Sequence, residues 1–177
     1  MSKLMNLLHL TSSRFFGGPE RQMLELALEL KPYFRTTIAS FSEGGRCREF
    51  LRGAREQGVD AVSIPADTPR LFAAKRDVQG MLRETAADVL ICHGYKAGII
   101  GLLAARSAGV AVIAVSRGWT AESPRVRLYE SLDRRVLRRM DHVVCVSHGQ
   151  AEKVFRAGVP VDRVSVIHNA VRCERFA

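Results

Sequence analysis

Seven short runs of β-branched or aliphatic residues recur along the chain at intervals of about 25 to 30 residues. These runs lie at residues 4–10, 35–41, 60–64, 88–92, 110–116, 142–147 and 163–168. Amphipathic helical patterns fill most of the segments between them. Strands that alternate with helices form a parallel sheet that is covered by helices on both faces. The sequence therefore predicts an open α/β sandwich with about seven parallel strands.

Helix signals agree with this alternation. Pro19 stands at a first helical position with Glu20 beside the positive end of the helix dipole, which predicts a helix from there to about Lys31. A later helix is expected over residues 125–139. Apolar side chains at three- or four-residue spacing predict its buried face, and these are Val126, Tyr129, Leu132, Val136 and Met140.

The length and charge of the chain limit what it can bind. Its 177 residues suit one well-buried domain, since domains most often have ~100–150 residues. Its 27 basic and 18 acidic residues give a net charge of +9, which favours anionic partners such as phosphates, nucleic acid or an acidic membrane. Aromatic residues make up only 7% and form no stacking motif, so we do not expect a nucleic-acid binder.

The cysteines and the apolar stretches indicate a cytoplasmic protein. Four scattered cysteines form no C-x-x-C pair, so neither a zinc site nor a disulfide framework is expected. No histidine pair has metal-ligand spacing either. We expect no secretory signal, and the apolar stretch 97–115 is broken by Arg106, Ser107 and Gly109. That stretch reads as a helix, a turn and a strand.

Candidate site residues follow the predicted strands, because ligands of an open parallel sheet bind beyond the carboxyl ends of its strands. These residues are Gly17, Gly18, His93, Gly94, Arg117, Gly118, Ser147 and Asn169. The glycines before the first helix can bring backbone N–H groups close to a phosphate, or can simply form a turn. His93 can bond a sugar hydroxyl, take part in proton transfer, or be an ordinary loop residue.

Two other residue types have structural interpretations. Ser147 is predicted to be the N-cap of a helix over 148–157, because "CVSHG" lacks the first glycine of a nucleophile elbow. His9 and His142 lie inside strand patterns and are interpreted as structural.

Five motifs in register give the chain a resemblance to a known family. They are "GGPERQ", "DVLICHG", "LLAARSAGVAVIAVSRG", "VVCVSHG" and "VIHNAVRCERF". Together they resemble the N-terminal domain of GT-B glycosyltransferases of family 4, over nearly the whole chain. The resemblance implies transfer of a sugar from a nucleotide-diphosphate sugar, with retention of anomeric configuration and without a metal or other cofactor.

Members of this family have two Rossmann-like domains that face a cleft, with the acceptor bound mainly by the first and the nucleotide by the second. Residues 1–167 would correspond to the first domain, and residues 168–177 to the start of the interdomain linker. The second domain's basic residue and glutamate pair have no counterpart here, so we expect this chain alone to be inactive. The alternative is a non-enzymatic α/β module that binds an anionic ligand or a partner protein through the same loops.

The resemblance also assigns roles to residues near the start of the chain and at the fourth strand. Gly17 and Gly18 match the family's glycine turn, whose backbone reaches the donor phosphates or the acceptor. Glu20 matches the acid that caps or orients the first helix. His93 matches the second position of the family's H-x-H, and Ile91 replaces the first histidine.

At the fifth strand the chain departs from the family. Arg117, preceded by Ser116, stands where the family usually has a histidine close to the transferred sugar. Arginine stays protonated and cannot shuttle protons, but it can neutralise a phosphate or a sugar carboxylate. His93 and Arg117 are therefore the catalytic candidates, and an anionic substrate is favoured. Near the end, Asn169 matches the asparagine of N-G-V-D, while Ala170 and Arg172 replace its glycine and acid.

The helix over 125–139 is strongly basic, and its arginines are at positions 125, 127, 134, 135, 138 and 139. Such a face can be merely solvated, or it can meet an anion or a membrane. Many relatives act on lipid-linked or bacterial envelope acceptors and dock on the inner membrane. The expected partners are thus a nucleotide sugar, a glycan or lipid-linked acceptor, and the inner face of the cytoplasmic membrane. The membrane candidates are Arg134, Arg135, Arg138 and Arg139, with Phe15, Phe16 and Trp119 nearby in sequence.

Overall fold

The computed structural model describes residues 4–67, 69–119 and 124–169, and the side chains of all of these except 124–126. The described chain forms one seven-stranded parallel sheet with the order β3-β2-β1-β4-β5-β6-β7. Its strands are β1 (Met5–Thr11), β2 (Phe34–Phe41), β3 (Asp60–Ile64), β4 (Val89–His93), β5 (Ala111–Ser116), β6 (His142–Cys145) and β7 (Val164–Val166). All seven predicted strands are confirmed, with ends that differ from the prediction by at most two residues.

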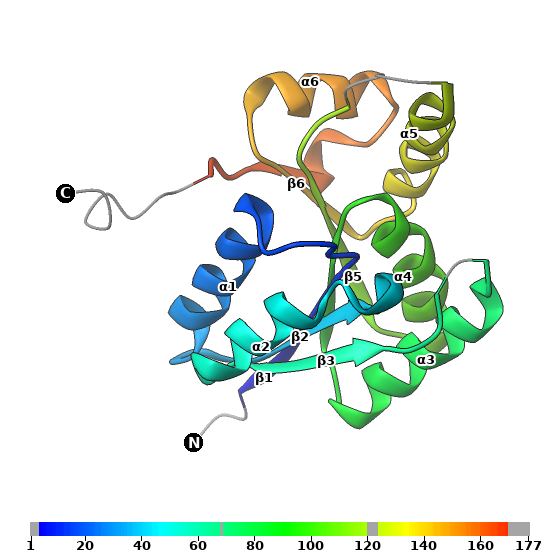
Figure 1. The fold of residues 1–177 in the computed structure, drawn as a ribbon. Helices are drawn as coiled ribbons and strands as arrows, with labels where there is room; N and C mark the ends of the chain where they lie inside the picture. The colour runs from blue at the N-terminus through cyan, green and yellow to red at the C-terminus, as the bar shows by residue number, and fades with distance from the viewer. Residues whose placement is uncertain (1–3, 68, 120–123, 170–177) are drawn as a thin grey trace.

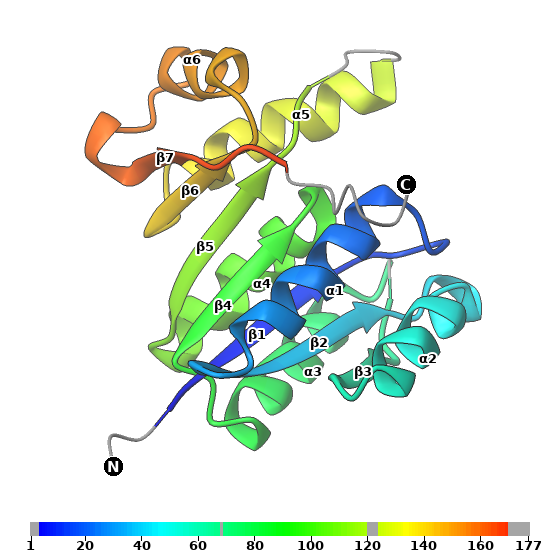
Figure 2. The same ribbon diagram turned by 90° about the vertical axis from the view of Figure 1, so that its left-hand side faces the viewer.

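Helices cover both faces of the sheet, as the sequence predicts (Figure 1 and Figure 2). They are α1 (Gly18–Leu30), α2 (Arg48–Glu56), α3 (Leu71–Glu84), α4 (Tyr95–Ala108), α5 (Pro124–Leu137) and α6 (His148–Arg156), with short 3₁₀ turns at Glu43–Gly45 and Val161–Arg163. One core cluster joins α1 and α2 to β2 and β3. In a larger cluster, the four helices α3, α4, α5 and α6 pack on the other face of the sheet.

The central strand β1 is buried on both faces from Leu7 to Thr11, because helices lie on either side of it. This explains why its sequence is a nearly continuous apolar run rather than an alternating one. At β1 the connections diverge: the chain passes to β2 on one side, and β4 lies on the other. Such a switch in strand order opens a crevice at the carboxyl edge of the sheet.

Helix α4 packs very closely on the sheet at Gly101. A Cβ atom added there would meet the Sγ atom of Cys92 inside van der Waals contact, and would lie 3.2 Å from Leu90 and 3.3 Å from Leu10. All three neighbours are buried. The absence of a side chain at residue 101 therefore sets the distance between helix and sheet.

The predicted buried face of α5 is wrong in part. Tyr129 and Leu132 are 39% and 37% exposed, whereas the stripe one residue further along is buried. That stripe consists of Glu130, Asp133 and Leu137. Val136 is partly buried and Met140 fully so, as expected, while the side chain of Val126 lies outside the described residues. The periodicity misleads because two carboxylates occupy inward positions that apolar counting assigns to solvent.

No helix in the described residues combines the length and the apolar character that crossing a membrane requires.

Candidate functional site

A cavity of about 290 Å³ lies at the carboxyl edge of the sheet, over the ends of β1, β4 and β5. It occupies the crevice beside the switch in strand order, between the start of α1 and the helices α4 and α5. Six of the sequence candidates line it: Glu20, His93, Gly94, Ser116, Arg117 and Gly118. Gly17, Gly18, Ser147 and Asn169 are not among its lining residues. The fold thus brings the carboxyl ends of β4 and β5, and the residues after them, together with the start of α1.

Two glycines shape the cavity wall through their backbone. Gly94, the N-cap of α4, has φ 87°, and Gly118 has φ 141°. L side chains rarely adopt these conformations, although a Cβ atom at either position would meet no atom within 4 Å. The glycines are therefore required by the turns rather than by lack of space.

His93 contacts two partners at the floor of the site. Its Nδ1 atom lies 3.2 Å from Nη1 of Arg117, and its Nε2 atom lies 3.0 Å from Nδ1 of His9. The two imidazole rings are nearly parallel, with an interplanar angle of 18° and centroids 5.2 Å apart. Burial lowers the pKa of His9 to about 4, with Arg117 contributing. Burial also lowers the pKa of His93 well below its usual range, helped by His9 and Arg117.

His9 is a site residue that the sequence interpretation missed. Its position inside a strand pattern favours a structural role. Yet His9 and His93 lie on the same face of neighbouring strands, since His9 pairs with Ile91 in the register of β1 and β4. The strand order would have revealed the pair, and a single sequence does not supply that order directly.

Arg117 is the one cationic side chain among the described residues that line the cavity. Burial lowers the pKa of its guanidinium, and the Glu20 carboxylate opposes this effect. Its Nε atom is buried and has no hydrogen-bond partner among the described residues. Because a buried unsatisfied donor is unfavourable, this nitrogen lacks an acceptor that an atom of a ligand could supply.

Asp133 adds a carboxylate to the cavity wall. The indole Nε1 of Trp119 donates a hydrogen bond of 2.9 Å to its Oδ2 atom. Burial raises the pKa of Asp133 to about 6, and the nearby Glu130 also raises it, against the opposing effects of Trp119 and Arg134. Glu130 is itself only 1% exposed. Glu130 and Asp133 share with Leu137 the spacing of one helix face, and all three are buried.

Asp133→Asn is expected to stabilise the protein at pH 7 by roughly 2 kcal/mol. The folded state holds a proton on Asp133 up to about pH 6, whereas its ordinary pKa is 3.8, so the parent's stability should fall as pH rises between these values. The asparagine keeps an acceptor for Trp119 and removes the ionisation. Urea denaturation from pH 4 to pH 7 measures both effects. Asp162→Asn, at an exposed position, is the control, and an equal gain there would contradict this account.

The glycine turn of the sequence forms the start of α1. The Gly17 N–H donates to the Phe15 carbonyl at 3.1 Å and to Oε2 of Glu20 at 3.2 Å. Glu20 therefore caps the helix, which confirms that expectation. The Gly17 N–H is therefore already bonded within the protein. The suggested phosphate contact of this turn stays a prediction.

Ser147 is the N-cap of α6, as predicted, and its Oγ atom accepts a hydrogen bond of 3.2 Å from the Gln150 N–H. The buried Gln150 side chain then donates to Oγ of Ser116 at 2.8 Å. The start of α6 is thereby tied to the end of β5 behind the cavity. Asn169 is exposed at the end of the described residues, and most of the proposed linker, 168–177, lies outside them.

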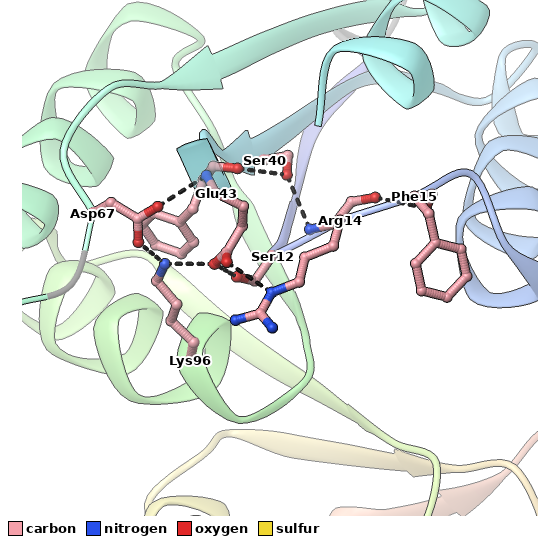
Figure 3. A network of polar contacts seen from close by, with 9 residues as sticks. Ser12, Arg14, Phe15, Ser40, Glu43, Asp67 and Lys96 are labelled. Atoms are coloured by element: carbon pink, nitrogen blue, oxygen red, sulfur yellow. Dashed lines mark hydrogen bonds and ion pairs between the residues drawn. The ribbon is translucent and has the colours of Figure 1, made fainter. Parts of the chain in front are cut away.

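Beside the cavity, Glu43 is the centre of a polar network that the sequence did not predict (Figure 3). Its carboxylate accepts hydrogen bonds from Ser12, from Arg14 at 2.9 Å and from Lys96 at 2.7 Å. Its N–H donates to Asp67 at 2.8 Å, and Asp67 also pairs with Lys96. Glu43 has φ 46°, an unusual value for a residue with a side chain. The network joins the segments after β1, β2 and β3 to the start of α4 at the carboxyl edge of the sheet.

Comparison with known proteins places the fold. A sequence model of Glycosyltransferase Family 4 matches residues 16–175. No curated protein shows a significant match. Among solved structures, Anabaena Alr3699/HepE in complex with UDP and glucose superposes with a TM-score of 0.74 at 18% identity, over 96% of this chain and 46% of its own.

Two further structures show how widely this fold is used. The lipopolysaccharide outer core galactosyltransferase WaaB gives a TM-score of 0.71 at 16% identity, over 94% of this chain and 46% of its own. A UDP-N-acetylglucosamine 2-epimerase gives 0.69 at 16% identity, over 94% and 49%. The chain spans about half the length of these proteins, and such distant likeness shows the fold alone. The match of the family's sequence model to most of the chain shows that it belongs to glycosyltransferase family 4, in which it corresponds to the N-terminal half of the GT-B fold.

Proposed function

We propose that the chain is the acceptor-binding half of a retaining glycosyltransferase that uses a nucleotide-diphosphate sugar. The observation that carries the proposal is the cavity at the switch in strand order, where Arg117 is the cationic lining residue and Asp133 and Glu20 are carboxylates. A crevice of this kind is where open α/β sheets bind ligands. HepE, which shares the fold, binds UDP and glucose.

In this proposal the chain's residues position the acceptor rather than activate the donor. Arg117 neutralises an anionic group, and Asp133 accepts a hydrogen bond from a hydroxyl or amino group of the acceptor. The second half of the protein holds the nucleotide diphosphate and compensates the charge on the leaving group. No metal or other cofactor is required in this scheme.

A transfer assay tests the proposal. We expect the chain alone to release no nucleoside diphosphate from a panel of UDP-sugars, because half of the reacting groups are missing. A protein that carries the chain together with a nucleotide-binding half should release it when an acceptor is present. Arg117→Gln in that protein is expected to lower kcat/KM by roughly tenfold to a hundredfold, because a charge-assisted contact is lost.

Arg156→Gln, at an exposed position on α6, is the matched control for that substitution. Transfer by the isolated chain would contradict the proposal. Absence of transfer by the two-domain protein would favour the non-enzymatic module instead.

We propose in addition that α5 and the residues after it dock peripherally on an anionic membrane that carries the acceptor. Leu128 is 61% exposed, and Arg127, Arg135 and Arg139 are exposed beside it. Apolar and basic side chains on one surface are typical of interfacial helices. Arg134 instead stacks on the Trp119 ring at 4.8 Å, and Arg138 donates to the Ala157 carbonyl. Arg135 and Arg139 are therefore the residues to test.

Two of the three aromatic residues named with this surface pack against the protein instead. Trp119 is partly buried and directs its N–H to Asp133, and Phe16 packs against Phe50 beneath α1 and α2. Phe15 is 67% exposed.

Arg135→Glu with Arg139→Glu is expected to weaken binding to phosphatidylglycerol-containing vesicles at least roughly tenfold, because each basic residue near such a surface contributes ~1 kcal/mol. Vesicle co-sedimentation measures the effect. Arg48→Glu with Arg52→Glu is the control, since these residues are equally spaced, exposed and on α2, and they change the net charge equally. Equal losses in both variants would show that only net charge matters and would overturn the docking surface.

A further inference from the structure

The proton positions of His9 and His93 follow from the chemistry of their neighbour Arg117. A guanidinium has only donors and stays protonated. Its Nη1 atom lies 3.2 Å from Nδ1 of His93, so that ring nitrogen offers its lone pair. His93 is then neutral and carries its single proton on Nε2.

The same reasoning extends to His9. The Nε2–H of His93 points to Nδ1 of His9 at 3.0 Å, so this second nitrogen accepts and His9 carries its proton on Nε2. That Nε2 atom is buried and has no hydrogen-bond partner among the described residues. A buried unpaired donor is destabilising, and an apolar pair in the same place would avoid it. Stability alone therefore does not account for the two histidines.

The geometry also shows which edge of Arg117 is not used by the described residues. Nη1 is bonded to His93. The edge formed by Nε and Nη2 includes the buried Nε–H that has no partner among the described residues. This edge presents two parallel N–H groups, which is the arrangement that binds two oxygens of one oxyanion.

We propose that His9 and His93 are positioning residues that hold the Arg117 guanidinium so that its Nε–Nη2 edge binds a phosphate or carboxylate group in the cavity. In this arrangement His93 keeps its proton on Nε2 and does not transfer it during the reaction, because both ring nitrogens are already engaged. The low pKa of both imidazoles agrees with neutral rings. The inference rests on the proposed function only in taking the cavity as the substrate site.

The first test is independent of any enzymatic activity. Long-range proton–nitrogen NMR correlations of the imidazoles report which ring nitrogens carry protons. We expect His9 and His93 to be neutral at pH 7, each with its proton on Nε2. A proton on Nδ1 of His93, or an imidazolium, would overturn the inference and leave the transferase proposal unaffected.

The second test uses two substitutions of nearly equal shape. His9→Asn keeps an acceptor oxygen close to the position of Nδ1, whereas His9→Leu has the same branching and no acceptor. The probes are inorganic phosphate and glucuronate, titrated by NMR. We expect the parent and His9→Asn to bind with similar affinity, His9→Leu to bind roughly fivefold to tenfold more weakly, and Arg117→Gln to lose the binding.

The two probes separate the two sources of the oxyanion. Binding of phosphate alone assigns the site to a phosphate group, and binding of glucuronate alone assigns it to a sugar carboxylate. Unchanged affinity in a folded His9→Leu, or no Arg117-dependent binding of either probe, would overturn the proposal. If His9→Leu does not fold, the proton positions in the parent still decide the matter.

Discussion

Lys96→Met is expected to lower the free energy of unfolding by about 3 kcal/mol. The Lys96 side chain is only 18% exposed and pairs with the side chains of Glu43, which is 9% exposed, and Asp67, which is 24% exposed. Its ammonium group also lies 4.6 Å from the centre of the Phe41 ring. Without it, two poorly solvated carboxylates remain close together, with Arg14 at the exposed side as the other cation of this network. The contacts that hold Glu43 at its positive φ would also weaken.

Urea denaturation at pH 7 measures this loss, with Arg156→Met as the control. Arg156 forms an exposed pair with Glu152, so its replacement should change the stability by less than ~1 kcal/mol. An equally small loss of stability in Lys96→Met would contradict the stabilising role of the Glu43 network.

The pH dependence provides a second check on the Lys96 prediction. Burial raises the pKa of Glu43, but hydrogen bonds from Lys96, Ser12 and Arg14 outweigh it and lower the pKa from 4.5 overall. A lowered pKa contributes stability above the unfolded value, and this contribution is lost as pH falls through the folded one. The difference between parent and Lys96→Met should therefore shrink as pH falls below 4.5.

Gly101→Ala is expected to cost about 2 kcal/mol, although alanine favours a helix over glycine by ~1 kcal/mol. The new methyl group would overlap the Cys92 sulfur and press on Leu90 and Leu10, so α4 would have to move away from the sheet. Gly80→Ala on α3 is the matched control. A Cβ atom there would meet only Oε1 of Glu84, at 4.0 Å, so this change should be neutral or stabilising.

A double mutant tests the cause of the Gly101→Ala effect. Cys92→Ala removes the sulfur atom that a methyl group at position 101 would overlap. Thermal unfolding of the two single variants and the double variant should show a cost well below the sum of the single costs, because the two positions touch. Additive costs would show that the clash is not with Cys92.

The sequence was sufficient for the sheet because each strand is a local signal. A buried parallel strand needs a short run of aliphatic residues, and β1 to β7 each contain one. The residues after the strands were found for the same reason: the fold itself directs His93, Ser116 and Arg117 to one edge. Local pattern and global architecture agree at these positions.

The missed residues are those whose role depends on a distant partner. His9 gains its role from His93, and Glu43 from Lys96 and Asp67, across the sheet or between loops. On α5 the acids Glu130 and Asp133 occupy buried positions because Tyr95 and Trp119 lie beside them. Neither propensity nor periodicity carries information about such pairings.

The central position of β1 also has a consequence for folding. Residue pairs between β1 and β4 are more than 80 positions apart, and Asn6 bonds to Ala86 and Asp88 across the same gap. Contacts between such distant segments form slowly, because a long loop must close first. During synthesis β1 to β3 can pair while β4 is still to be made. The cavity draws its walls from both halves of the sheet, so the binding site is completed only when β4 and β5 have joined the first half.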